Sequence, residues 1–169
     1  MTHTAVEKRI KIAILCALSV TFFLLDTVLP KPIPFLKYGV ANMIPLILIF
    51  NREYKTAAGV MLFKIVIGNL ITAKLLSPIF LLSFFGGVGA LAVMFFAEIL
   101  LRRGISIYGL GLLGAFGHVF FQLLAVKWLI IQGINVYFFY KLFFIPTFIS
   151  AIIISYLARW LNETELAKL

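Results

Sequence analysis

The sequence has few charged side chains and very few acidic ones. Only 12% of its 169 residues are charged, and Asp and Glu together number 6. Hydrophobic residues make up 63% of the chain, which leaves too few polar side chains to cover a water-soluble domain of this length. The scarcity of charge therefore excludes an ordinary soluble protein and predicts an all-α membrane protein whose main solvent is lipid.

Cysteine and histidine are also scarce. Cys16 is the only cysteine and lies in an apolar run, which excludes an intramolecular disulfide and a thiolate metal cluster. His3 and His118 are far apart, and no carboxylate clusters with His118, so we expect neither a metal nor another cofactor. The net charge of +9 does not indicate nucleic-acid binding, because the basic residues lie between apolar runs rather than along a stripe with interleaved aromatics.

The signatures of common catalytic sites are missing. The chain has no Asp-rich metal–diphosphate motif, no phosphate-binding loop of the P-loop type and no nucleophile elbow. Glu98 has no second acid at a spacing that would indicate an acid/base pair. The sequence therefore favours a protein that is not an enzyme and that cannot itself use ATP to drive transport.

Long apolar runs are what the sequence has in abundance. A helix needs about 20 apolar residues to cross the hydrocarbon core, and lipid offers no partner for free backbone groups. Six segments approach this length, so we predict a six-transmembrane-helix bundle in a single integral membrane domain over residues 1–169. The predicted spans are about Ile10–Leu29, Phe35–Phe50, Thr56–Lys74, Pro78–Leu101, Ile107–Ile131 and Tyr137–Trp160.

The distribution of Lys and Arg predicts the orientation, because these residues collect on the cytoplasmic side. With an even number of spans, nine of them share a side with both termini, and every Arg is in this group: Lys8, Arg9, Lys11, Arg52, Lys55, Arg102, Arg103, Arg159 and Lys168. The other side has four, namely Lys31, Lys37, Lys74 and Lys141. Both termini of this cell-membrane protein are therefore predicted to be cytoplasmic.

Two lysines fall inside predicted spans, where an ionisable group costs about 2.5–3.5 kcal/mol at the bilayer centre. Lys127 is close to the outer end of its span, so snorkelling of its ammonium to the interface and a functional role are both open. Lys64 is near the middle of its span, where snorkelling is harder. The pattern favours function for Lys64.

Polar side chains mark one face of the fifth span. His118 and Gln122 are four residues apart and therefore share a helix face, and small residues such as Gly114 and Gly117 precede them. Such side chains contact a ligand or form hydrogen bonds between helices, and the spacing alone leaves both open. Asn42 and Asn69 have the same ambiguity.

The outer side carries ammonium groups with few carboxylates beside them. Lys37, Lys74 and Lys141 lie at the outer ends of spans, Lys31 lies in the first outer loop, and Asp26 is the aspartate on this side. This pattern would attract a carboxylate, phosphate or diphosphate. An equally favoured alternative is that these lysines are simply solvated near the lipid headgroups and bind no ligand.

Several segments together resemble the Gx transporter family, also known as heptaprenyl diphosphate synthase component I. The stretch from Leu29 to Met43, LPKPIPFLKYGVANM, is similar to the family signature IP…P…LK.GLAN. Ser83 with Gly86-Gly87, and the segment from Gly114 to Gln122, are similar to two further family segments in the same order. The chain departs from the pattern in three places, since Val119 replaces Asn, Phe121 replaces Gly and Lys64 stands where Arg is expected.

This family in turn resembles the substrate-binding S components of energy-coupling factor (ECF) transporters. The resemblance implies a six-helix subunit that docks on a coupling transmembrane subunit bound to two ATPases. It implies docking through Ala13 and Ala17, a small-residue pair that otherwise indicates only a close helix contact. It also implies a gate loop with Pro30, Lys31, Pro32 and Pro34, and ligand contacts from Lys37, Asn42, Lys64, His118 and Gln122, to which Asn69 is added as a further candidate.

Three functions follow as hypotheses. The first is a substrate-binding subunit of an ECF-type importer that captures a small anionic or amphipathic metabolite from the outer side. The second, from the older family name, is a membrane accessory subunit of a prenyl diphosphate synthase. The third, a purely structural subunit, is least favoured because structural helices rarely need a lysine such as Lys64 at mid-span.

Overall fold

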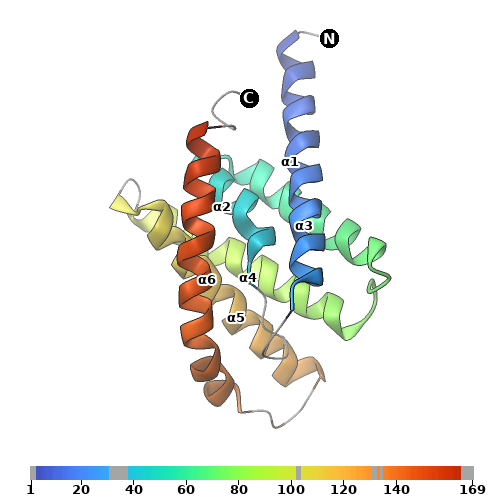
Figure 1. Cartoon of the computed structure of the whole chain (residues 1–169), viewed down its shortest axis with the longest axis vertical. Coiled ribbons are helices and arrows are strands. Elements are labelled where there is room, and N and C mark those ends of the chain that lie inside the picture. Colours follow the sequence, from blue (N-terminus) through green and yellow to red (C-terminus); the bar gives the residue numbers. More distant parts are fainter. Residues whose placement is uncertain (1–2, 31–37, 102–103, 131–132, 134, 165–169) are drawn as a thin grey trace.

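The computed structural model describes residues 3–30, 38–101, 104–130, 133 and 135–164. Within these residues the chain is helical and has no strand. The elements are α1 (His3–Val28), the short 3-10 helix η1 (Val40–Asn42), α2 (Met43–Phe50), α3 (Tyr54–Ile71), α4 (Pro78–Leu101), α5 (Ile107–Ala125), the π-helical turn η3 (Val126–Ile130) and α6 (Val136–Thr164). Figure 1 shows that α1 begins and α6 ends at the same end of the molecule, which we call the terminal end.

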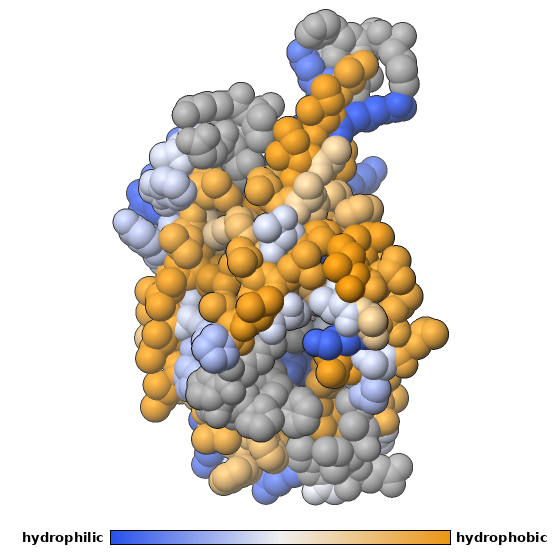
Figure 2. All heavy atoms as spheres, turned by 45° about the vertical axis from the view of Figure 1, so that its right-hand side comes forward, coloured by the Kyte–Doolittle hydropathy of each residue, from blue (hydrophilic) through white to orange (hydrophobic). Residues whose placement is uncertain are grey.

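Five of these helices are long and apolar enough to cross a membrane. They cover Val6–Val28, Tyr54–Ile71, Pro78–Leu101, Ile107–Leu129 and Val136–Thr164. Many large apolar side chains on their surfaces are exposed, and Figure 2 shows hydrophobic residues over much of one face, with hydrophilic ones at its upper and lower ends and near a central hollow. The prediction of a multi-pass membrane protein built from helices is therefore confirmed.

The predicted second span differs from the other five. Only Val40–Phe50 of it is helical among the described residues, and Phe35 to Lys37 lie outside them. At about 1.5 Å per residue the eight residues of α2 extend roughly 12 Å, well short of the ~30 Å hydrocarbon core. All of α2 from Met43 to Ile49 is buried, because a helix that is apolar all round belongs inside a bundle. The structure thus shows five membrane-length helices around a short buried one.

Glycines bring α4 and α5 together. A Cβ atom on Gly114 would lie 2.7 Å from Sδ of Met94, and one on Gly117 would lie 2.8 Å from Cγ2 of Val93. In the reverse direction, the ring of Phe121 on α5 fills the space above Gly89 on α4. Small residues let membrane helices approach closely, so these two helices form the tightest pair of the bundle.

The turn between α2 and α3 ties three other helices together at the terminal end. Asn51 Nδ2 donates to Asn162 Oδ1 of α6 over 2.7 Å, and Arg52 Nε donates to Glu98 Oε1 of α4 over 2.8 Å. Glu53 pairs with Lys11 of α1 over 3.3 Å. Three consecutive residues therefore join α1, α4 and α6 at this end of the bundle.

Candidate ligand-binding site

Lys64 is buried in the middle of α3, with 2% of its surface exposed. Its Nζ atom donates to the carbonyl oxygen of Ala41 over 2.5 Å and to Oδ1 of Asn42 over 2.6 Å. Both acceptors belong to η1, directly before the buried helix α2. The ammonium is therefore directed into the bundle, where hydrogen bonds offset part of the cost of removing it from water.

Asn42 connects Lys64 to His118 of α5. Its Nδ2 atom lies 3.4 Å from Nδ1 of His118. Because the Lys64 ammonium can only donate, it fixes Oδ1 of Asn42 as the acceptor and leaves the amide nitrogen as the donor to His118. In a neutral imidazole, Nδ1 of His118 would be the acceptor of this contact. Residues from α3, η1 and α5 thus form one polar relay, which we call the Lys64–Asn42–His118 relay.

The Lys64–Asn42–His118 relay stands between two chambers of one pocket. The larger chamber encloses about 490 Å³, its open mouth included, and the smaller about 320 Å³. Gly39, Asn42 and His118 line both. The smaller chamber is also lined by Lys64 and by Asp26 of α1, whereas the larger one extends between α5 and α6.

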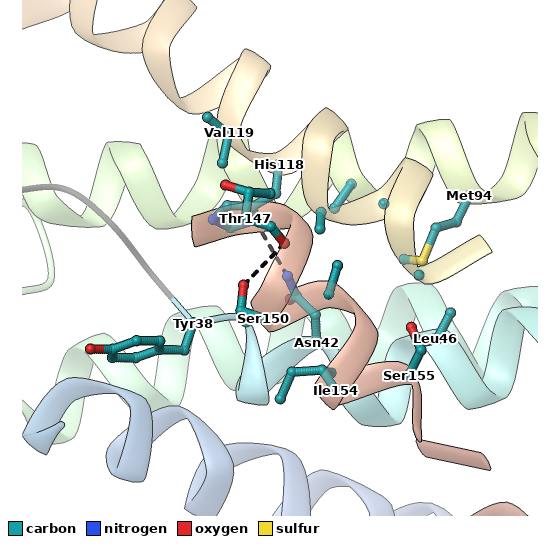
Figure 3. Close-up of a pocket in the computed structure, with 16 residues that line it drawn as sticks. Tyr38, Asn42, Leu46, Met94, His118, Val119, Thr147, Ser150, Ile154 and Ser155 are labelled. Atoms are coloured by element: carbon teal, nitrogen blue, oxygen red, sulfur yellow. Dashed lines mark hydrogen bonds between the residues drawn. The ribbon is translucent and has the colours of Figure 1, made fainter. Parts of the chain in front are cut away.

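The polar side chains of the larger chamber gather near its middle, and Ser155 lies apart from them among apolar neighbours. Figure 3 shows Asn42, His118, Thr147 and Ser150 gathered near its middle, with Leu46, Met94 and Ser155 toward one end. The spacing along α6 agrees, because Ser155 is eight residues beyond Thr147 and so lies about 12 Å farther along the helix. A ligand in this chamber would lie beside the relay near the middle and beside Leu46, Met94 and Ser155 toward one end.

Tyr38 joins the pocket to the end of α1. Its hydroxyl donates to the carbonyl oxygen of Pro30 over 2.5 Å, and its backbone N–H donates to Oδ1 of Asp26 over 3.2 Å. The Tyr38 residue also lines the larger chamber. The two ends of the proline-rich segment are therefore held together at the pocket, although Lys31, Pro32, Pro34 and Lys37 themselves lie outside the described residues.

The structure brings together only some of the predicted ligand contacts. Asn42, Lys64 and His118 line the pocket, whereas Asn69 and Gln122 are buried but are not among its lining residues. The Asn69 amide instead donates to the Ile65 carbonyl one turn back, over 2.7 Å. Asn69 therefore bonds to the backbone of its own helix, whereas Asn42 lines the pocket.

The other marked residues lie on the surface. Lys127 is exposed in η3, with its ammonium 5.8 Å from the centre of the Trp128 ring. Lys141 lies 4.3 Å from the centre of the Tyr137 ring. Ala13 and Ala17 are exposed on α1, and the exposed Pro30 follows it. Among the described residues no group of three His, Cys, Asp or Glu side chains lies close enough to hold a metal ion.

The pocket contains residues that the sequence reasoning missed, on α6. Thr147, Ser150, Ala151, Ile154 and Ser155 line the larger chamber. They recur at three- and four-residue intervals, so they form a stripe of mostly small side chains on one face of a helix otherwise rich in Phe and Ile. This periodicity was the signal that could have found them.

The family comparison agrees with this architecture. The family model described as heptaprenyl diphosphate synthase component I matches residues 15–161. The chain belongs to this family. The matched range begins in α1 and ends in α6, and it includes every residue that lines the two chambers. Comparisons with curated proteins and with solved structures gave no match.

Proposed function

We propose that this chain is the substrate-binding membrane subunit of an ECF-type importer, and that it captures a small anionic or amphipathic metabolite from the outer side of the cell membrane. The observation that carries the proposal is the buried Lys64 ammonium at the wall of a pocket, joined through Asn42 to His118. An ionisable residue at this depth marks a functional site in most membrane proteins.

The charges of the pocket favour a particular way of binding. Lys64 and Asp26 line the smaller chamber together, so its two formal charges cancel, whereas the larger chamber presents Asn42 and His118 without a carboxylate. An anionic group placed at Asn42 would approach the Lys64 ammonium while avoiding Asp26. The rest of the ligand would then extend into the larger, mostly apolar chamber between α5 and α6.

ATP-driven transport by this chain would require partners, because its sequence has no motif for ATP binding. We propose that a coupling transmembrane subunit with two ATPases supplies the energy. The exposed pair Ala13 and Ala17 would let a partner helix approach α1 closely. In this proposal the chain itself is not an enzyme and uses no cofactor.

A second candidate is an accessory membrane subunit of a prenyl diphosphate synthase. The family description, heptaprenyl diphosphate synthase component I, favours it. In that role the pocket would hold part of a prenyl product while a soluble partner carries out catalysis. Affinity purification of the tagged chain separates the two functions, since a coupling subunit with ATPases supports the first and a prenyl synthase supports the second.

The binding role is tested with the full chain in lipid nanodiscs, by measuring the melting temperature with a panel of carboxylates, phosphates and diphosphates. We expect at least one compound to raise it, and Lys64→Met to abolish most of this rise because the ammonium is lost at similar side-chain length. Lys127→Met is the matched control, since Lys127 is exposed outside the pocket, and should respond like the wild type. A panel without any stabilising compound, for a folded protein, would refute the binding role.

A further inference from the structure

The hydroxyl groups of this protein usually bond to their own helix. Thr21, Thr72 and Ser83 donate to the carbonyl oxygen four residues back, over 2.9–3.0 Å. This is the common solution in membrane helices, because hydrocarbon offers a hydroxyl no partner. A buried hydroxyl in a pocket wall that lacks such a hydrogen bond to its own helix therefore needs another explanation.

Two hydroxyls on α6 depart from the pattern. Thr147 and Ser155 are 3% and 0% exposed, and among the described residues neither side-chain oxygen has a hydrogen-bond partner. Both residues line the larger chamber, Thr147 near the polar relay and Ser155 toward the other end, beside Gly111 (Figure 3). Their positions along α6 differ by about 12 Å, which is the scale of a small molecule.

Burial of a hydroxyl without a partner is unfavourable, and a hydrocarbon chain in the chamber would leave both oxygens in that state. A ligand with a hydrogen-bonding group at its buried end would satisfy them. We propose that Thr147 and Ser155 form a second polar contact line of the pocket, and that the ligand is a compact molecule polar at both ends instead of a prenyl chain. This inference rests on the proposed substrate-binding role and defines the class of substrate.

Ser19 provides a matched comparison. Its hydroxyl is also fully buried and without a hydrogen-bond partner among the described residues, but it lies on α1 and is not among the residues that line either chamber. Removal of this oxygen changes the same chemistry at a place that the ligand does not reach. Ser19→Ala therefore controls for any general effect of deleting a buried hydroxyl.

The test compares two probes, octanoate and 8-hydroxyoctanoate, on the full chain in lipid nanodiscs. The probes share a carboxylate for the relay and differ only in the terminal hydroxyl. We expect 8-hydroxyoctanoate to bind the wild type about tenfold more tightly, a ratio typical of one buried hydrogen bond that is otherwise left unmade. Ser155→Ala should reduce this preference to within about twofold, Thr147→Val should weaken binding of 8-hydroxyoctanoate several-fold, and Ser19→Ala should preserve the preference.

The outcomes separate this inference from the proposed function. Equal binding of both probes to the wild type, or a preference that survives in Ser155→Ala, overturns the inference. If both probes nevertheless bind and Lys64→Met weakens the binding of both, the substrate-binding role stands even though the inference about Thr147 and Ser155 fails. Binding of neither probe overturns this inference, and the broader anion panel then decides the binding role. The variants should fold, because deleting a hydroxyl that has no partner does not lower the melting temperature.

Discussion

The Nζ atom of Lys64 lies 2.6 Å from Oδ1 of Asn42, so a lysine in the middle of a membrane-length helix is paired with the turn that precedes the buried helix α2. The contact joins segments 22 residues apart in the sequence. It also places a cation beside the amide that separates the two chambers. In the proposed function, the same contact serves both ligand binding and stability.

The first prediction concerns this pair. Asn42→Leu removes an acceptor from a buried ammonium, so we expect it to lower the free energy of unfolding by about 2–4 kcal/mol. Lys64→Met removes the charge itself and should cost less. The double variant should be more stable than the sum of the single losses predicts. Denaturant unfolding of the full chain in detergent micelles gives the three values, and additive losses would contradict the coupling.

The second prediction concerns the ion pair at the terminal end. Glu98 is 4% exposed and accepts hydrogen bonds from Arg52 and from the hydroxyl of Tyr54. Arg52→Ala leaves a buried carboxylate with one partner fewer, and we expect a loss of about 2–3 kcal/mol in the free energy of unfolding. Arg159→Ala, which breaks the exposed Arg159–Glu163 pair, should cost less than about 0.5 kcal/mol. Equal losses would show that the burial of Glu98 is unimportant.

The third prediction concerns the contact between α4 and α5. Gly89→Ala places a methyl group against the Phe121 ring, and overpacking of this kind costs about 1–3 kcal/mol. Gly59→Ala is the control, because a Cβ atom there has no atom within 4 Å and alanine favours the helix over glycine by up to about 1 kcal/mol. We therefore expect Gly89→Ala to lower the melting temperature and Gly59→Ala to hold or raise it. A neutral Gly89→Ala would mean that the two helices can separate without loss.

The fourth prediction concerns the docking role proposed for Ala13 and Ala17 on α1. Ala13→Leu together with Ala17→Leu adds bulk to an exposed face without touching the pocket, so ligand-induced stabilisation should remain while co-purification of the coupling subunit is lost. Ala92→Leu on α4 adds one leucine side chain to another part of the surface and should leave co-purification unchanged. Loss of the partner in all of these variants would indicate a general packing defect instead of a docking face.

The contrast between Asn42 and Asn69 shows how far the site could be predicted. Both were marked because an amide in an apolar run has few explanations. Asn42 became part of the pocket, whereas Asn69 bonds to the backbone of its own helix. Sequence spacing cannot separate these cases, because the distinction depends on which helix lies opposite.

The pocket wall on α6 escaped prediction for a related reason. Thr147 and Ser155 are small, uncharged residues that occur at many places in membrane helices without contacting a ligand. Their significance depends on the missing hydrogen bonds and on the chamber between α5 and α6. A cavity is a property of the assembled bundle, and no single helix carries it in its sequence.

The sequence by itself determined that this protein is built from membrane-crossing helices, because apolar runs of sufficient length have no other stable form in lipid. It also indicated Lys64, Asn42 and His118 as candidate functional residues, since polar groups are costly inside apolar helices. The tertiary structure decided that the second apolar run forms a short buried helix, that those three side chains meet, and that α6 completes the pocket. These features depend on packing between helices distant in the chain, which hydrophobic periodicity does not specify.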